Sequence, residues 1–311
     1  MAETAWLFAG QGAQFVGMGK DLTEAFPACR DVFMRADDTL GYGLSDICFE
    51  GPLETLTKSN HCQPAIFAVS AACLIAARES GLAESDPAGM AGLSLGEWTA
   101  LHAAGGLSFE DTLRVLEARG RFMQEACEET DGAMLSVIGL DSATLAEICA
   151  DTGAVVANLN SPEQTVLSGA RSAIEAAERL AKEKGAKRAI LLNVAGAFHS
   201  PLMASAARRL KDVLADIEFG PLRVPVMANA TGRPHGGPDQ IRDAMAAQVT
   251  SSVQWVSCME QLRAAGASRW IELGPGRVLS GLLKRVDSAA RVCHIQDLSS
   301  LEKAGRELAD G

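Results

Sequence analysis

Short apolar segments alternate with longer helical segments along almost the whole chain. The first runs from Thr4 to Phe8, and a second, Gly89 to Gly92, leads directly into a helix that extends to Leu101. Strands that alternate with helices in this way are typical of a mainly parallel sheet covered by helices. The chain has 311 residues, and at this length roughly three quarters of the unfolded surface is buried on folding. We therefore expect an α/β fold with a large core.

The rhythm changes in the middle of the chain to strand, helix, strand, strand, helix, strand. This order is the split βαβ, or ferredoxin-like, pattern. The sequence thus predicts a discontinuous large α/β domain over 1–127 and 196–311 and a ferredoxin-like insertion at 128–195. Within the insertion we expect strands at 133–139, 154–160, 164–169 and 187–194, and helices at 142–150 and 171–184. Elsewhere we expect helices at 20–39, 63–80, 108–127, 201–216, 239–249, 253–265 and 278–286, and strands at 224–229 and 269–272.

Composition excludes several classes of partner. The net charge of −11, from 28 Lys and Arg against 39 Asp and Glu, argues against nucleic acid, whose binders usually carry a basic stripe. The longest uncharged apolar stretch, Pro64 to Ala77, is shorter than the roughly 20 residues that span a bilayer, so we expect a buried helix and no membrane partner. Residues 1–12 lack the features of a secretory signal.

The cysteines and histidines point to a cytoplasmic protein without a metal. Eight cysteines are scattered without a C-x-x-C pair, which indicates reduced thiols in a cytoplasmic protein. Five histidines show no spacing typical of a metal site. We therefore expect neither a metal nor any other cofactor.

The strongest local signal is Gly92-Leu93-Ser94-Leu95-Gly96, the G-x-S-x-G pattern of a nucleophile elbow. The chemistry requires small residues on both sides of the serine, because the strand turns sharply into a helix and a Cβ atom would collide with neighbouring backbone. The serine then stands at a helix N-terminus, where free N–H groups favour developing negative charge. The pattern predicts Ser94 as a nucleophile.

Two further side chains are candidates for the same site. His199 lies between a predicted strand and a predicted helix, at the kind of sheet edge where α/β sites are found, and is either the base for Ser94 or a structural histidine. Arg119 lies on the apolar face of a predicted helix. A buried guanidinium needs an anionic partner, which is either a structural carboxylate or a substrate carboxylate.

The turn Gly10-Gln11-Gly12 follows the first strand. It fits neither phosphate-binding fingerprint, because Phe15 and Met18 occupy positions that need Gly and Lys. A loop at this place can instead supply a backbone N–H to an oxyanion hole, beside the N–H of Leu95.

Five motifs, taken together and in this order, resemble the malonyl-CoA:acyl-carrier-protein transacylase family of fatty acid and polyketide synthesis. The resemblance extends over essentially the whole chain. The resemblance implies a hydrolase-like α/β domain with a ferredoxin-like insertion. The motifs are Phe8-Ala9-Gly10-Gln11-Gly12-Ala13-Gln14, Gly92-Leu93-Ser94-Leu95-Gly96-Glu97, Arg119-Gly120-Arg121-Phe122-Met123-Gln124, Gly196-Ala197-Phe198-His199 and Glu272-Leu273-Gly274-Pro275-Gly276.

The resemblance also implies roles for these residues. Ser94 is the expected nucleophile, His199 the general base and Arg119 the anchor for the free malonyl carboxylate. The backbone N–H groups of Gln11 and Leu95 are expected to form the oxyanion hole.

Further positions carry less specific roles. The family orients the histidine with a main-chain carbonyl instead of an Asp, and the matching position is Gln248. Asn160 and Asn229 fall in motifs that line the cleft, and Phe198 is expected to crowd the α-carbon and favour malonyl over methyl-branched groups. The chain departs from many members at Ala9, where they have Pro, and at Leu93, where they have His. Leu93 could alter the surroundings of the nucleophile.

The implied reaction is ping-pong transfer of malonyl from malonyl-CoA to the phosphopantetheine thiol of acyl carrier protein, with the coenzyme A thioester as substrate and no cofactor. Such carriers are typically acidic, so a chain of charge −11 needs a local basic surface. Two clusters are candidates: a first basic cluster of Lys182, Lys184, Lys187 and Arg188, and a second basic cluster of Arg208, Arg209 and Lys211.

Two other functions remain open at this point. A serine esterase or thioesterase on the same elbow usually has an acid between Ser and His in chain order. Asp111, Asp131, Asp141 and Asp151 are available, but none clearly follows a strand of the large domain. The other alternative is a non-catalytic scaffold that binds the carrier without acylation of Ser94.

Overall fold

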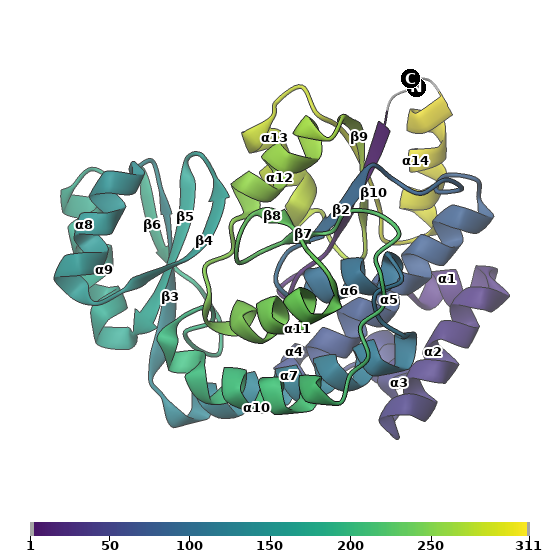
Figure 1. Cartoon of the computed structure of the whole chain (residues 1–311), viewed down its shortest axis with the longest axis horizontal. Coiled ribbons are helices and arrows are strands. Elements are labelled where there is room, and N and C mark those ends of the chain that lie inside the picture. The colour runs from purple at the N-terminus through teal and green to yellow at the C-terminus, as the bar shows by residue number, and fades with distance from the viewer. Residues whose placement is uncertain (1–2, 310–311) are drawn as a thin grey trace.

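The computed structural model describes residues 3–309 and is built around a four-stranded parallel sheet (Figure 1). The strands are β1 (Glu3–Phe8), β2 (Gly89–Gly92), β9 (Ala267–Leu273) and β10 (Arg291–Ile295), in the order β10-β9-β1-β2. All three strand pairs are parallel. Ala5 to Phe8 is a continuous apolar run because helices cover both faces of this central strand. The expected α/β class is confirmed.

Side chains of β1 divide between two apolar cores. Trp6 and Phe8 point to the side of α2 (Pro27–Leu40), α5 (Ser59–Glu79), α6 (Leu95–Ala103) and α7 (Phe109–Glu129). Ala5 and Leu7 point to the side of α12 (Trp255–Ala264) and α13 (Val278–Val286). This alternation follows from the two-residue repeat of a strand, and it fixes β1 between two helical layers.

Helix α5 passes through the middle of the larger core. It is 21 residues long and apolar enough to cross a membrane by length and composition, but 83% of its most apolar window is buried inside the protein. A helix that is apolar all round is accounted for by burial of this kind. The helix expected around Pro64 to Ala77 is therefore a core helix.

The second sheet is antiparallel and matches the predicted ferredoxin-like unit. Its strands are β3 (Gly132–Ile138), β4 (Val155–Ser161), β5 (Gln164–Ala170) and β6 (Arg188–Leu191), in the order β4-β5-β3-β6. Helices α8 (Ser142–Thr152) and α9 (Arg171–Glu183) cover one face and share a separate apolar core with it. The domain boundaries at 127/128 and 195/196 remain a prediction.

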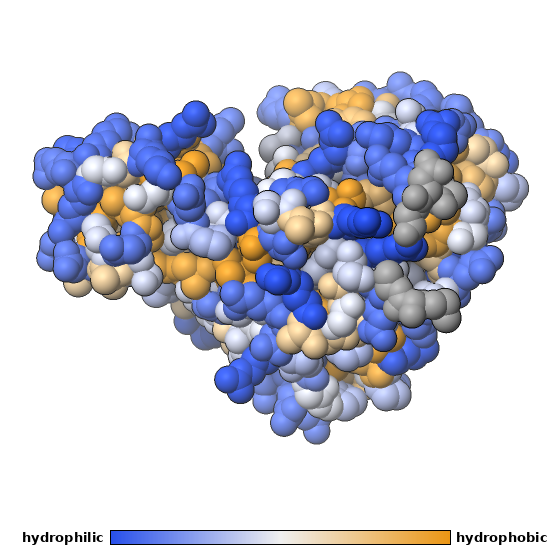
Figure 2. All heavy atoms as spheres, turned by 90° about the horizontal axis from the view of Figure 1, so that it is seen from above, coloured by the Kyte–Doolittle hydropathy of each residue, from blue (hydrophilic) through white to orange (hydrophobic). Residues whose placement is uncertain are grey.

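The lobe that carries β3 to β6 lies to one side of the main body (Figure 1). Seen from above, a notch separates the two, and hydrophilic residues cover most of this face (Figure 2). Backbone hydrogen bonds join the lobes, because Leu159 on β4 donates to Val253 O at 2.9 Å and Val253 donates to Ala157 O at 2.8 Å. Ser251, close to Val253 in this junction, contacts His199 of the main body through its carbonyl.

Several expected elements differ in the structure. The helix expected at 20–39 is two helices, α1 (Lys20–Ala25) and α2, because Phe26 precedes Pro27 and is extended. The strand expected at 224–229 is reduced to β7 (Met227–Ala228), although Val226 forms a parallel bridge with Met90. Strand β10 was not predicted. Also unpredicted were α3 (Leu44–Glu50), α4 (Leu53–Thr57), β8 (Arg233–Pro234) and α14 (Leu298–Ala309).

The remaining segments lead into the site. The helix expected at 201–216 begins with a 3-10 turn, η1 (Pro201–Met203), and continues as α10 (Ala204–Ala215). The helix expected at 239–249 is α11 (Pro238–Ala247) followed by a 3-10 turn, η2 (Gln248–Thr250). The first 3-10 turn follows His199 by one residue, and the second begins with Gln248, whose carbonyl contacts that histidine.

Candidate active site

Ser94 stands at the sharp turn between β2 and α6, with φ 54° and ψ −105°. A Cβ atom at Gly92 would lie 1.9 Å from the carbonyl carbon of Gly96, and one at Gly96 would lie 2.2 Å from Phe8 O. Both contacts are with backbone and cannot be relieved by a side-chain movement. The two glycines of the motif are therefore required by close packing, and the predicted elbow is present.

Asn229 holds the elbow in place. Its Oδ1 accepts from Ser94 N–H at 2.7 Å, and its Nδ2 donates to Gly92 O at 2.8 Å. The residue is fully buried. Asn229 was expected to bind substrate, but both of its polar side-chain atoms are bonded to elbow backbone, so its role in this structure is to position the elbow.

Ser94 and His199, which lie 105 residues apart, form a hydrogen-bonded pair. Ser94 Oγ is 2.9 Å from His199 Nε2. The other ring nitrogen, Nδ1, lies 3.0 Å from Gln248 O and 3.1 Å from Ser251 O. Carbonyl oxygens only accept, so Nδ1 carries the proton and Nε2 is left to accept from the serine hydroxyl. The Gln248 carbonyl is where the resemblance placed it, whereas the second carbonyl, from Ser251, was not foreseen.

Burial keeps the imidazole neutral. Desolvation, followed by the nearby positive charge of Arg119, lowers the pKa of His199 to about 4. At neutral pH the ring is therefore unprotonated and can take a proton. His199 also has a positive φ of 56°, and with Ser94 it is one of two non-glycine residues between 3 and 309 with positive φ. Strained backbone of this kind is common at functional sites.

Arg119 reaches the same hydroxyl from α7. Its side chain is 1% exposed, and its Nη2 donates to Ser94 Oγ at 3.1 Å and to Gln248 Oε1 at 3.0 Å, while Nη1 donates to Gln63 Oε1 at 2.6 Å. The α7 helix can approach α5 closely because residue 120 is a glycine. A Cβ atom at this position would lie only 2.2 Å from Ser59 O.

The Arg119 guanidinium has only neutral oxygens as hydrogen-bond partners. Its Nε is buried and has no partner among the described residues. Burial lowers its pKa to about 10, while Glu97 opposes the shift, so the group stays charged at neutral pH. A buried cation with an unused donor is suited to an anionic substrate group.

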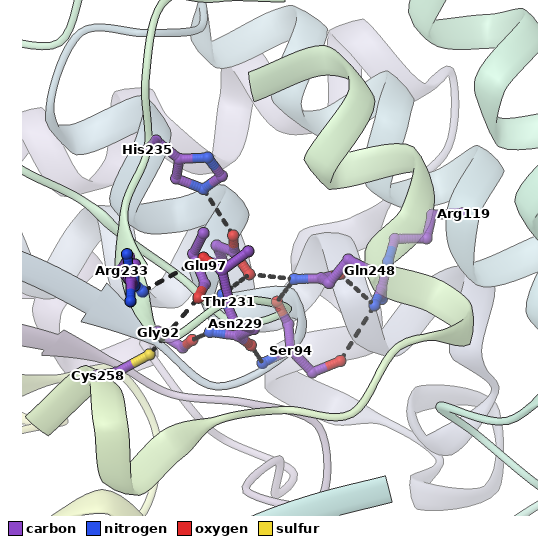
Figure 3. A network of polar contacts seen from close by, with 11 residues as sticks. Gly92, Ser94, Glu97, Arg119, Asn229, Thr231, Arg233, His235, Gln248 and Cys258 are labelled. Atoms are coloured by element: carbon purple, nitrogen blue, oxygen red, sulfur yellow. Dashed lines mark hydrogen bonds and ion pairs between the residues drawn. The ribbon is translucent and has the colours of Figure 1, made fainter. Parts of the chain in front are cut away.

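Glu97 and His235 extend the hydrogen-bond network away from Ser94 and were not predicted (Figure 3). Gln248 Nε2 donates to Glu97 Oε2 at 2.6 Å and to Ser94 O at 2.9 Å. Glu97 Oε1 lies 2.7 Å from His235 Nε2, and both side chains are 1% exposed. One signal was available: Glu97 is an acidic residue on a helix whose other residues are almost all apolar and buried.

The proposed oxyanion donors are unoccupied within residues 3–309. Neither Gln11 N–H nor Leu95 N–H makes a hydrogen bond in that range. Leu95 is the first residue of α6 and directly follows Ser94. The Gln11 side chain donates to Ser59 Oγ at 3.2 Å and accepts from Gln63 at 3.4 Å, which links the loop to the residue that holds Arg119. The oxyanion hole remains a prediction.

The last two predicted substrate contacts are Phe198 and Asn160. Phe198 is 9% exposed and immediately precedes His199. Asn160, on β4, lines a cavity of about 370 Å³ together with Leu93 and residues of α13. Its Oδ1 is buried without a hydrogen-bond partner among the described residues. Because Leu93 precedes the nucleophile, this cavity adjoins the elbow.

The acids considered for a hydrolase triad lie elsewhere. Asp111 lies in the first turn of α7, where its N–H donates to the capping Ser108 hydroxyl, Asp141 caps α8, and Asp131 pairs with Arg171. Neither these three nor Asp151 contacts His199, whose Nδ1 is bonded to carbonyls. Between residues 3 and 309, no three His, Cys, Asp or Glu side chains are grouped to hold a metal ion.

The two basic clusters differ in how far their charges are already paired. In the first basic cluster Lys182, Lys184 and Lys187 each form an ion pair with a glutamate. In the second basic cluster, on α10, Arg209 pairs with Glu125. Arg208 and Lys211 are exposed and make no ion pair with a described residue.

Comparison with known proteins agrees with this architecture. The model of the acyl transferase domain family matches residues 5–306. A malonyl CoA-acyl carrier protein transacylase from Bacillus subtilis (strain 168) is 42% identical over 315 residues, which cover 100% of this chain and 98% of that protein. The structure of an acyl carrier protein S-malonyltransferase from Vibrio cholerae O1 biovar eltor is 39% identical with a TM-score of 0.93, covering 97% of this chain and 99% of that one.

A second solved structure holds a type II PKS acyl-carrier protein in complex with its malonyl-transacylase. It is 40% identical with a TM-score of 0.93 and covers 97% of this chain and 99% of that one. Family match, full-length identity and fold all agree. The chain therefore belongs to the acyl transferase domain family and, within it, to the malonyl-CoA–acyl carrier protein transacylases.

Proposed function

We propose that this chain transfers malonyl from malonyl-CoA to the phosphopantetheine thiol of acyl carrier protein through an ester on Ser94. It is an acyl-carrier-protein S-malonyltransferase. The observation that carries the chemical assignment is that Ser94 Oγ lies 2.9 Å from His199 Nε2 and 3.1 Å from Arg119 Nη2. One hydroxyl thus meets a neutral base and a buried cation.

The first half-reaction begins at the hydroxyl. His199 Nε2 takes the proton as Ser94 Oγ attacks the thioester carbonyl carbon, and the carbonyl oxygen becomes an oxyanion. The N–H groups of Leu95 and Gln11 stabilise it. When the C–S bond breaks, the proton on His199 passes to the sulfur, coenzyme A leaves as a thiol, and the malonyl-serine ester remains.

Arg119 selects for the free carboxylate of the acyl group. The Nε–H and Nη2 groups of an arginine point the same way and form a fork that matches a carboxylate. In Arg119 the Nε–H is unused within the described chain, and Nη2 is bonded to the serine that the substrate will acylate. An uncharged acyl group would leave this buried cation unpaired.

The second half-reaction repeats the chemistry with a different thiol. The carrier's phosphopantetheine thiol gives its proton to His199 and attacks the ester carbonyl, and the proton then returns to Ser94. A solved relative is a complex of an acyl-carrier protein with its malonyl-transacylase. The cavity lined by Asn160 and Leu93 adjoins the elbow, which supports an approach of the pantetheine arm from this side.

Three further features support assignments of location, domain organisation and acyl selectivity. All eight cysteines are free and seven of them are buried, which supports a reducing, cytoplasmic location. The separate core beneath β3 to β6 supports 128–195 as an inserted domain. The position of Phe198 beside His199 supports a role in excluding branched acyl groups.

Intact mass spectrometry tests the central assignment. Mixing with malonyl-CoA should add one malonyl group to the protein, and adding carrier protein should remove it. Ser94→Ala should give no adduct, whereas Ser168→Ala, a buried serine on β5, should acylate normally. An adduct that persists in Ser94→Ala would exclude this nucleophile. Discharge of the adduct to water instead of carrier would favour a thioesterase, and carrier binding without any adduct would favour a scaffold.

A further inference from the structure

We propose that Glu97 and His235 are positioning residues that hold Gln248 between a carboxylate and the Arg119 guanidinium, and so keep Arg119 available for the substrate carboxylate. The proposal rests on the malonyl transfer described above and adds a determinant of its acyl selectivity. Neither residue is placed to touch the substrate, because Glu97 is bonded to Gln248, Asn229 and His235 and none of these bonds reaches the Ser94 hydroxyl.

The Gln248 amide has only one orientation that satisfies its neighbours. On one side Arg119 Nη2, a group that only donates, lies 3.0 Å from Oε1. On the other side Glu97 Oε2, which as a carboxylate only accepts, lies 2.6 Å from Nε2. A flipped amide would place donor against donor and acceptor against acceptor. Glu97 therefore fixes which end of Gln248 faces the guanidinium.

Glu97 itself has three hydrogen-bond partners, and none of them is an arginine. His235 Nε2 lies 2.7 Å from Oε1, and Asn229 N–H donates to Oε2 at 3.1 Å in addition to the Gln248 bond. These contacts hold the carboxylate one side chain away from Arg119. A direct ion pair between Glu97 and Arg119 would satisfy the guanidinium internally and compete with malonyl for it.

The same network touches the nucleophile. Gln248 Nε2 also donates to Ser94 O at 2.9 Å (Figure 3). Damage to the network can thus slow acylation by any thioester, and a loss of rate alone would not identify the role. Selectivity separates the two effects, because only malonyl needs Arg119, whereas acetyl needs only the elbow, the base and the oxyanion donors.

His235→Leu and His235→Gln form the primary test. Leucine removes the donor to Glu97 and glutamine can supply an amide donor in its place. We expect the ratio of kcat/KM for malonyl-CoA over acetyl-CoA to fall about tenfold or more in His235→Leu, the factor typical of one hydrogen bond to a charged group. In His235→Gln we expect the ratio to stay within about threefold of wild type.

Gln248→Met provides an independent measurement should His235→Leu fold poorly. It cuts the link between Glu97 and Arg119 while leaving the His235–Glu97 pair intact, and the selectivity ratio should fall by a similar factor. If His235 acts through Gln248, the variant that combines His235→Leu with Gln248→Met should lose no more selectivity than Gln248→Met alone. Additive losses would show that His235 acts by another route.

Glu272→Gln is the matched control. Glu272 is a fully buried carboxylate that accepts from Leu279 N–H at 2.9 Å and Ser280 N–H at 2.7 Å, away from this network. Its substitution can cost stability but should leave the selectivity ratio unchanged. An unchanged ratio in folded His235→Leu and Gln248→Met would overturn the inference, whereas a wild-type protein that forms no malonyl adduct would overturn the proposed function instead.

Discussion

Acylation of Ser94 should be nearly independent of pH between about 5.5 and 8. Burial, with a further contribution from Arg119, lowers the pKa of His199 to about 4. At pH 5.5 only about 3% of such an imidazole is protonated, whereas about 90% of a histidine with an ordinary pKa near 6.5 is protonated. The kcat/KM for acylation reports the free enzyme's base. It should therefore fall by less than about 10% at pH 5.5, against about tenfold for an unperturbed histidine.

The lowered pKa of His199 also makes the free energy of unfolding depend on pH. A shift from 6.5 to about 4 corresponds to about 3 kcal/mol of preference for the neutral ring at about 1.4 kcal/mol per pKa unit. Between about pH 4 and 6.5 the unfolded chain carries a proton on His199 that the folded chain does not. The contribution of His199 to the free energy of unfolding is therefore constant above about pH 6.5, and stability falls as the pH drops from 6.5 towards 4.

Rapid-quench intact mass spectrometry with limiting malonyl-CoA at pH 5.5, 6.5 and 7.5 measures the acylation rate constant. Near-ultraviolet circular dichroism at each pH checks that the protein remains folded. Arg119→Gln, assayed with acetyl-CoA, removes the second cause of the shift and should move the acid limb to higher pH. A tenfold loss for the folded wild type between pH 7.5 and 5.5 would refute the burial argument.

Three other substitutions test separate parts of the site. Arg119→Ala removes about two charge-assisted hydrogen bonds to the malonyl carboxylate, so kcat/KM for malonyl-CoA should fall about 10²- to 10⁴-fold while that for acetyl-CoA falls far less; equal losses for the two thioesters would make Arg119 structural. Gly92→Ala places a Cβ atom 1.9 Å from Gly96 backbone and should abolish the malonyl adduct and lower Tm, whereas Gly237→Ala, with nothing within 4 Å of the new Cβ, should retain both; normal acylation by Gly92→Ala would contradict the elbow geometry. Charge reversal at Arg208 and Lys211 should slow transfer to carrier protein more than acylation by malonyl-CoA, and equal effects on the two half-reactions would exclude the second basic cluster as the docking surface.

The elbow could be predicted because all of its determinants are local. Gly92, Ser94 and Gly96 lie within five residues, and the strand before and the helix after them have their own apolar patterns. The strand and helix order of the 133–194 segment was readable for the same reason. The sequence also contains a signal for the break between α1 and α2, although one helix was expected at 20–39. Pro27 is that signal, because the residue before a proline avoids helical backbone.

The support beneath the site could not be predicted because it joins residues far apart in the chain. His235 and Glu97 are 138 residues apart, and Gln248 and Glu97 are 151 apart. No spacing rule links such positions, and each side chain taken alone is compatible with an exposed loop or a structural ion pair. Asn229 was assigned to the cleft for a related reason: its burial against Gly92 and Ser94 depends on where a short strand, β7, meets β2.

The strain at Ser94 and His199 explains why this distant support is needed. Each residue holds a positive φ, which costs on the order of 1–3 kcal/mol for a side chain other than glycine. For Ser94 the opposing contacts are the Asn229 amide and the Gln248 amide, bonded to its N–H and its carbonyl. For His199 they are the two carbonyls on Nδ1. Since Gln248 supplies one of those carbonyls as well as the amide, a single residue restrains both strained positions and the substrate anchor, and the geometry of nucleophile, base and cation is set together.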